Sequence, residues 1–185
     1  MSSTRTGGRS AIVRTKVLNA ASELATTKGL QNVSMPEIAQ RAGVAVTSLY
    51  RRWGDVGSLL LDVAVERLAH KWPLPDEGSI ENDLKCWGER IALGLNSPEE
   101  PTFFRILLAT SDVAPEKRIG ALAPRLEQIQ AMLQRGSARG ETTPSVDDVV
   151  NHLLAPLYMR ALIGFPVDMA FADQLVDRLL TWTRE

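Results

Sequence analysis

The sequence contains one cysteine, Cys86, and two histidines, His70 and His152. A single cysteine excludes a disulfide within the chain and suits a reducing compartment. These three residues lie far apart and form no metal-spaced cluster, and there is no phosphate loop or dinucleotide fingerprint. We therefore expect neither an enzyme nor a cofactor or metal site. Cys86 itself is either a redox sensor or a small packing residue beside Trp87.

Long apolar runs are also missing. A membrane helix needs about 18–20 apolar residues, and the run LLLDVAV at 59–65 is broken by Asp62. The N-terminal stretch MSSTRTGGRS lacks the apolar core of a signal peptide. We therefore expect a cytoplasmic protein with no membrane partner. No period-two strand pattern follows residue 78, so the predicted fold class is all-α.

Positive charge is concentrated at one end of the chain. Residues 1–54 contain eight Lys/Arg and two Asp/Glu, a balance of +6. The remaining residues contain thirteen Lys/Arg and twenty Asp/Glu, a balance of −7, so the net charge of −1 hides the asymmetry. A basic N-terminal part on an acidic body is typical of a protein that binds a polyanion at one end.

Residues 33–60 contain two short helical patterns separated by a glycine. Ser34 and Glu37 have the spacing of a capping box, in which the Ser34 hydroxyl accepts from the Glu37 amide and the Glu37 carboxylate returns to the Ser34 amide. Pro36 suits a first helical turn, and Gly43 suits the left-handed residue that ends a helix. The spacing therefore predicts a short helix that stops at Gly43.

A second helix can begin directly after this turn, with Val44 and Leu49 facing a core. Its outer face would carry Val46, Thr47, Ser48, Arg51 and Arg52. Arginine can bridge the O6 and N7 atoms of guanine or bind phosphate, and Ser or Thr can do either. Two such helices are typical of a helix-turn-helix, and the alternative is an ordinary αα-hairpin with a solvated basic face.

The stretch AQRAGVAVTSLYRRWGDVGSLL, residues 39–60, resembles the DNA-binding signature of the TetR family of bacterial regulators. The matching positions are Ile38, Ala39, Ala42, Gly43, Val44, Leu49, Tyr50, Trp53, Leu59 and Leu60. The resemblance is specific over residues 12–68, and beyond them only architecture and length agree. Three positions depart from the family pattern. Ala45 replaces a hydroxyl residue at the start of the recognition helix, Thr47 replaces a glycine, and Val56 replaces a phosphate-binding lysine.

The resemblance implies an N-terminal helix-turn-helix head of three helices and a C-terminal helical domain for effector binding and dimerisation, about nine helices in all. The expected domains are residues 10–72 and 78–185, with the Pro-rich segment 72–78 as the boundary. A helix capped by Asp55 would connect the head to the body, so that its tilt carries a signal.

Candidate DNA contacts follow from the same comparison. They are Ser34, Val46, Thr47, Ser48, Tyr50, Arg51 and Arg52, with Arg5 and Arg9 on an N-terminal arm. Thr47, Ser48 and one of the two adjacent arginines are the base-reading candidates. Tyr50, Ser34 and the other arginine would contact phosphate. The arm is either a frayed terminus or a segment that follows DNA.

After the boundary, helical patterns cover residues 80–95, 99–111, 115–139, 147–163 and 170–182. Pro124 and Pro156 fall inside two of them and should kink them. The last two patterns carry apolar bands wider than one stripe, which indicates burial against two partners. The second partner is either the chain's own domain or a second copy, and TetR-like proteins dimerise through their last two helices. The candidate interface residues are Leu153, Leu157, Leu175, Leu179 and Trp182.

An effector site is implied by the resemblance and not by any spacing. Large apolar groups with two polar handles are the candidates: Trp87, Ile91, Phe103, Phe104, Leu107, Met132, His152 and Tyr158. For each residue alone, ordinary core is the competing interpretation. A small, mostly apolar effector is expected.

We therefore predict a homodimeric repressor that binds an inverted-repeat DNA operator and is released by a small molecule. One alternative is a DNA-binding activator, or a regulator without an effector. Another is an all-α enzyme or carrier whose basic head has no DNA role.

Overall fold

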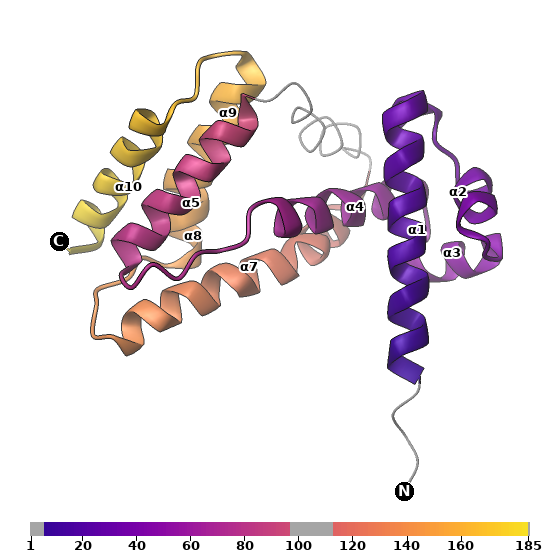
Figure 1. Ribbon diagram of the computed structural model, residues 1–185, viewed down its shortest axis with the longest axis horizontal. Helices are drawn as coiled ribbons and strands as arrows, with labels where there is room; N and C mark the ends of the chain where they lie inside the picture. Colours follow the sequence, from indigo (N-terminus) through magenta and orange to yellow (C-terminus); the bar gives the residue numbers. More distant parts are fainter. Residues whose placement is uncertain (1–5, 97–112, 185) are drawn as a thin grey trace, which may run out of the picture. The chain divides into compact units, whose positions relative to one another are not determined.

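The computed structural model describes residues 6–96 and 113–184, and all of its regular elements are helical (Figure 1). The helices are α1 (Thr6–Lys28), α2 (Met35–Ala42), α3 (Val46–Trp53), α4 (Val56–Lys71), α5 (Ile80–Leu95), α7 (Pro115–Ala138), α8 (Val146–Val149), α9 (Ala155–Ile163) and α10 (Met169–Arg184). A 3₁₀ turn, η1 (Leu30–Asn32), follows α1, and a π-helix, η2 (Val150–Leu154), joins α8 to α9. The predicted all-α fold is confirmed. The pattern at 99–111 lies outside the described residues.

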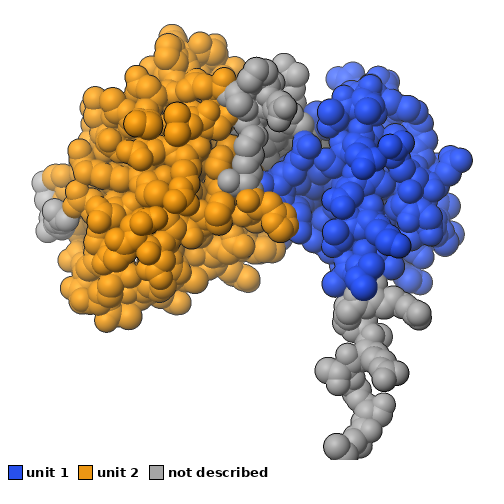
Figure 2. All heavy atoms as spheres, in the orientation of Figure 1, with its two compact units in different colours: residues 1–67, 105–121 blue, residues 68–104, 122–185 orange. Residues whose placement is uncertain are grey.

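The chain divides into two compact units (Figure 2). Unit 1 comprises residues 1–67 and 105–121, and unit 2 comprises residues 68–104 and 122–185. The division therefore falls inside α4 and inside α7. It precedes the boundary expected at the Pro-rich segment because Leu68 and Trp72 are buried in the core of unit 2.

Unit 1 packs α1, α2, α3 and most of α4 around a small apolar core. Val17, Ala21, Ile38, Leu49 and Leu59 are all buried there. The small side chain of Ala21 on α1 permits close packing, and α1 contacts α2, which contacts α3. This packing leaves the outer side of α3 free to carry polar groups.

Ion pairs and a hydrogen bond fix α1 and α3 to α4. Arg14 of α1 lies 2.8 Å from a carboxylate oxygen of Glu66 and 3.4 Å from one of Asp62. The indole of Trp53, the last residue of α3, donates to the same Asp62 carboxylate at 3.0 Å. The end of the second short helix is therefore attached to α4 through a partly buried acid.

The turn between α2 and α3 has the backbone that the sequence predicts. Gly43 has φ 68° and ψ 39°, a left-handed conformation that other residues rarely adopt, and its amide bonds to carbonyls of α2. The following amide, Val44, donates to Ala39 at 3.0 Å and closes the turn. At α3, Ala45 occupies the N-cap position without a side-chain cap, as its methyl group requires.

The predicted capping box at α2 is wrong in one of its two bonds. The Ser34 side chain makes no cap hydrogen bond to the Glu37 amide. Instead, the Ser34 hydroxyl donates to the Glu37 carboxylate at 2.9 Å, and Lys28 of α1 pairs with the same carboxylate. The Ser34 hydroxyl bonds to the charged carboxylate rather than to the Glu37 amide, because Lys28 holds that carboxylate beside Ser34.

Unit 2 has a larger core, built from α5, α7, α9, α10 and the two short elements before α9. Its largest fully buried side chains are Trp87, Leu84, Ile91, Ile129, Met132, Leu153 and Leu157. Helix α10 packs along α5. The end of α4 joins this core through Trp72, whose indole lies over Gly94 of α5.

Both prolines that interrupt helical patterns are accommodated without breaking them. Pro124 lies inside α7, which continues from Pro115 to Ala138. Pro156 lies in the first turn of α9, immediately after the π-helix η2. There the Ala155 amide donates to the Val150 carbonyl, five residues back. The helix therefore widens into a π-turn just before Pro156, which has no amide proton to donate.

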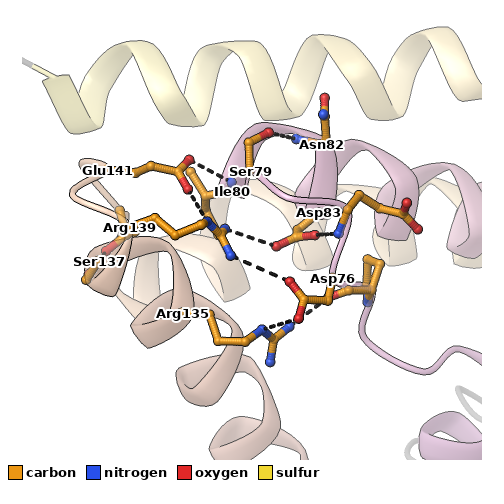
Figure 3. Close-up of polar contacts among 12 residues, drawn as sticks. Asp76, Ser79, Ile80, Asn82, Asp83, Arg135, Ser137, Arg139 and Glu141 are labelled. Carbon is orange, nitrogen blue, oxygen red and sulfur yellow. Dashed lines mark hydrogen bonds and ion pairs between the residues drawn. The ribbon is translucent and has the colours of Figure 1, made fainter.

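The Pro-rich segment after α4 is held by charged residues in the last turn of α7 and just after it (Figure 3). Arg135 donates to the Pro75 carbonyl at 2.7 Å, and Arg139 lies 3.5 Å from both Asp76 and the fully buried Asp83. Beside them, Glu141 accepts from the Ile80 amide at 2.8 Å. The segment is therefore part of unit 2 and is not an isolated linker.

Candidate nucleic-acid interface

Helix α3 presents a mostly polar outer face because Leu49 and Trp53 are turned inward. Leu49 and Trp53 are buried, whereas Tyr50 is about half exposed. The predicted contact residues lie on the accessible side: Thr47, Arg51 and Arg52 are exposed, and Val46 and Ser48 are half-buried. The structure therefore gathers all of the predicted α3 contacts on one short helix with its end anchored at Trp53.

The two adjacent arginines differ in how they are held. Arg52 lies over the Trp53 ring at 5.2 Å and donates to the Ser10 hydroxyl at 3.3 Å. Arg51 makes no hydrogen bond or ion pair with the part of the chain that the structure describes. Arg52 is thus pre-positioned, while Arg51 remains available to a ligand.

Ser34 lies at the N-terminus of α2, half-buried, with its hydroxyl committed to Glu37. Lys28 and then Ser34 lower the pKa of Glu37 by hydrogen bonding to its charged form. A phosphate contact by Ser34 would therefore compete with an existing carboxylate bond. Arg5 lies outside the described residues, and the backbone of Arg9 is part of α1.

The turn from α3 to α4 is fixed by Asp55, as the sequence predicts. Its carboxylate accepts from the Ser58 amide at 2.7 Å, and Lys117 of α7 lies 3.1 Å from its other oxygen. Burial alone would raise the pKa of Asp55, but the bonds from Ser58 and Lys117 outweigh it and hold the pKa below its ordinary value. The carboxylate therefore stays charged at neutral pH.

Two family models match the chain. The model described as "Bacterial regulatory proteins, tetR family" matches residues 17–66, which include α2 and α3. The model described as "Tetracyclin repressor-like, C-terminal domain" matches residues 74–179, more than half of the chain.

The chain belongs to the TetR family. It is therefore a helix-turn-helix transcriptional regulator that binds DNA, and not an enzyme. The N-terminal family model spans both α2 and α3, so the αα-hairpin alternative and the carrier alternative are both excluded.

Proteins described as transcriptional regulators are similar to this chain along most of its length. An HTH-type transcriptional regulator of Rhodococcus erythropolis, AqdR, is 32% identical over 180 residues, 94% of this chain and 86% of its own. A DNA-binding transcriptional repressor, TetR, of Mycobacteroides abscessus is 29% identical over 173 residues, 89% of this chain and 90% of its own. Among solved structures, a TetR family transcription regulator has a TM-score of 0.74 at 27% identity, covering 91% of this chain and 97% of its own.

The predicted effector residues separate into three groups. Trp87, Ile91 and Met132 are fully buried in the core of unit 2, and Tyr158 packs partly buried against that core. His152 is half-buried, with its ring 4.8 Å from that of Trp182 in an edge-on contact. Phe103, Phe104 and Leu107 lie outside the described residues. The structure thus brings four of the eight candidates into one core.

Sequence reasoning missed Arg125, a charged residue that is buried beside the predicted effector residue Trp87. It is 7% exposed, its guanidinium lies 5.2 Å from the Trp87 ring, and it donates to the Trp72 carbonyl at 2.6 Å. Burial lowers the pKa of Arg125, and Tyr158 acts in the opposite direction. Helical spacing could have found it, since Arg125 lies four residues before Ile129 and seven before Met132, on the buried face of α7.

The predicted dimer residues are placed mostly inside the protomer. Leu153, Leu157, Leu175 and Leu179 are buried in the core of unit 2, so they cannot offer surface to a second copy. Trp182 is 57% exposed. The large exposed apolar side chains of the last two helices and the turn between them are instead Met159, Leu162, Ile163, Phe165, Met169 and Trp182.

Two further results come from the described residues. No helix among them is both long and apolar enough to cross a membrane. Nor do they contain a group of three or more side chains that could hold a metal ion.

Proposed function

We propose that this protein is a homodimeric repressor that binds an inverted-repeat operator in the cytoplasm and is released by a small molecule. The observation that carries the DNA part is the accessible face of α3, with Thr47 and Arg51 exposed and Leu49 buried beneath them. One such helix from each protomer would enter successive major grooves about 34–36 Å apart. Repression is supported by the relative described as a repressor.

Within α3, Arg51 is the proposed base-reading arginine. A guanidinium without a described partner can adopt the planar fork that guanine O6 and N7 require. Arg52 already lies against Trp53 and Ser10, so it is suited to a phosphate contact that fixes orientation. Thr47 and Ser48 supply hydroxyls next to it, and Tyr50 supplies a half-exposed phenol for phosphate.

A second copy of the chain is the proposed occupant of the exposed apolar face of α9 and α10. This face includes Leu162, Ile163 and Trp182, which expose 43%, 61% and 57% of their surface. Exposing several large apolar side chains to water is costly, and pairing two copies about a two-fold axis would cover them. The paired helices would bring two heads onto one DNA duplex.

The proposed effector acts on the core around Trp87 and Tyr158, and α4 carries the change to the head. A small molecule can only shift the protein between two forms if it binds one of them better. Here the end of α4 belongs to the same core through Trp72, so a change of packing in that core reaches α4 directly. Arg125 adds a cation beside Trp87, which favours an effector that combines an apolar body with an acceptor group over a purely apolar one.

The experiment that tests the DNA part is selection of bound sequences from a pool of random duplexes, using purified full-length protein at a stated salt concentration. The proposal predicts enrichment of one inverted repeat. The matched control is Arg51→Ala together with Thr47→Ala, which should fold normally and lose enrichment. If wild-type protein that is shown to be folded enriches no sequence, the proposed operator recognition is wrong.

A regulator without an effector is the second candidate. It is distinguished by screening small molecules for loss of binding to the selected duplex. Binding of a molecule to the protein without any change in operator affinity would favour this candidate over the proposed linkage.

A further inference from the structure

Helices α4 and α7 both cross the division between the two compact units, α4 after residue 67 and α7 after residue 121. Each unit contains one polar contact between α7 and a residue that flanks α4. These contacts are Lys117–Asp55 in unit 1 and Arg125–Trp72 in unit 2. We propose that α7 holds both ends of α4, and that Lys117 and Arg125 are positioning residues for the recognition helix α3. The regulatory meaning of this proposal rests on the proposed function.

At the beginning of α4, Lys117 holds the residue that caps the helix. Its ammonium lies 3.1 Å from one oxygen of Asp55, while the other oxygen accepts from the Ser58 amide. A β-carbon at Gly54, the residue after α3, would lie 3.4 Å from the same ammonium. A cation in the first turns of α7 is disfavoured by that helix's own dipole. The interaction that stabilises Lys117 is instead its ion pair with the Asp55 carboxylate, at the turn between α3 and α4.

At the end of α4, Arg125 holds the first carbonyl after the helix. Its guanidinium donates to the Trp72 carbonyl at 2.6 Å in a buried hydrogen bond. A cation is favoured at this position because the carbonyl end of a helix carries partial negative charge. The same guanidinium lies over the Trp87 ring and donates to Gln128 at 2.9 Å. Arg125 therefore connects the Trp87 ring with the end of α4.

Between these two contacts, α7 contains its weakest backbone. Pro124 has no amide proton, so the carbonyl of Gly120 lacks its usual helical donor. Gly120 is itself a poor helix former, and a β-carbon there would meet no atom within 4 Å. The unit division falls between these residues, after Ala121. Residues 115–121 can therefore follow unit 1 while the rest of α7 follows unit 2.

The test at Lys117 uses amide hydrogen exchange of the full-length protein and affinity for the selected operator duplex. Lys117→Met removes the cation, and Asp55→Asn removes the carboxylate charge while keeping a side chain that caps helices well. We expect each to speed exchange of peptides covering residues 46–60, and to weaken operator binding, by about three- to fivefold, the range of a partly exposed ion pair. The double variant should be no worse than either single variant.

The matched control is Lys16→Met, which removes an exposed cation from unit 1. It should leave exchange of residues 46–60 unchanged. The two test variants also change net charge in opposite directions. If Lys117→Met weakened operator binding while Asp55→Asn strengthened it, Lys117 would be acting through its charge on DNA, and the positioning role would be wrong.

The test at Arg125 compares Arg125→Met, which keeps the apolar stem, with Arg125→Lys, which keeps a donor. We expect Arg125→Met to speed exchange of residues 68–74 by about tenfold or more, as loss of a buried charged hydrogen bond implies, and Arg125→Lys to do so less. Both should weaken operator binding although residue 125 lies in unit 2. If Arg125→Met does not fold, as denaturation would show, Arg125→Lys carries the test.

Exchange along α7 tests the weak segment in the same experiment. Faster exchange of residues 115–121 in Lys117→Met, with residues 126–138 unchanged, is the expected result. Equal changes in both segments would show that α7 moves as one rigid helix, and no change at residues 46–60 in either Lys117→Met or Asp55→Asn would overturn the proposal. If no operator is selected by the wild-type protein, the proposed function fails, and the exchange measurements still decide the positioning role.

Discussion

Gly94 lies directly beneath the indole of Trp72 in unit 2. A β-carbon at position 94 would come within 2.8 Å of both Cε2 and Nε1 of the ring and closer still to Cζ2. Glycine is therefore required at the second-last position of α5 because the first residue after α4 packs its ring onto the helix backbone. The contact attaches the end of α4 to the core of unit 2.

Gly94→Ala should destabilise unit 2 by about 1–3 kcal/mol, because the ring must shift to accept the new methyl group. Denaturant unfolding followed by circular dichroism measures this. Gly120→Ala is the matched control: a β-carbon there meets no atom within 4 Å, and the change should stabilise the helix. Equal stability of Gly94→Ala and wild type would contradict the packing.

Arg51→Ala should weaken binding to the selected operator by about 1–3 kcal/mol and relax the sequence preference at one base pair in each half-site. Arg52→Ala should weaken binding to specific and random duplexes alike and reduce the salt dependence of the affinity. Fluorescence anisotropy at several salt concentrations separates the two effects. A uniform loss in Arg51→Ala would reassign Arg51 to phosphate contact.

The acid sensitivity of unit 2 should depend on Glu141 (Figure 3). Its carboxylate accepts from the Ile80 amide and pairs with Arg139. Both interactions lower the pKa of Glu141 below the ordinary value for glutamate, and the bond from Ile80 has the larger effect. Because the pKa is lower in the folded state, the charged carboxylate stabilises the fold at pH values above the unfolded-state pKa, near 4.3. This contribution is lost as the pH falls through the folded-state pKa.

Glu141→Gln removes this contribution. It should be less stable than wild type at pH 7, and the difference should shrink as the pH falls below about 4. Unfolding curves collected across this range provide the measurement, with Glu116→Gln as the control on an exposed acid of α7. A difference that stays constant with pH would show that Glu141 acts by packing alone.

Cys86 should react slowly with alkylating reagents at neutral pH. Burial first, and then the nearby Glu77, raise the pKa of its thiol, although Arg90 acts in the opposite direction. Its sulfur lies 3.8 Å from a Glu77 oxygen, which disfavours the thiolate. Iodoacetamide labelling of folded and denatured protein should give the slower rate in the folded state. Faster labelling of the folded protein would favour the redox-sensor interpretation.

Charge placed on the exposed apolar face of α9 and α10 should prevent dimerisation. Ile163→Asp should raise the dimer dissociation constant at least about tenfold, because a charge buried between copies would have no partner. Sedimentation velocity over a concentration series measures the change. Ile12→Asp, at an equally exposed isoleucine of α1, should leave the dimer intact. A monomeric wild type would contradict the homodimer.

Features set by neighbouring residues were predictable from the sequence. Gly43 ends α2 in a left-handed conformation and Asp55 caps α4, because both depend on local backbone rules. The hydrogen bond that the Ser34 side chain makes was not predictable, because Lys28 of another helix pairs with Glu37. Local spacing cannot report a partner that arrives through folding.

Contacts between residues far apart in the sequence show the same limit. Arg125 and Trp72 are 53 residues apart in sequence, and Lys117 and Asp55 are 62 apart, so no motif connects either pair. The width of the apolar bands predicts burial against two partners for the last two helices, and the second partner stays a prediction. That width could not tell that Leu153 and Leu175 face their own protomer while Ile163 and Trp182 face outward.

The most direct test of this account is the affinity of the protein for the selected duplex compared with the same duplex after one half-site is scrambled. Anisotropy titrations at fixed salt concentration give both affinity and stoichiometry. A dimer with one α3 in each half-site predicts two protomers per intact duplex and at least about a hundredfold weaker binding when one half is scrambled. Equal affinity for the two duplexes would contradict recognition of an inverted repeat by paired heads.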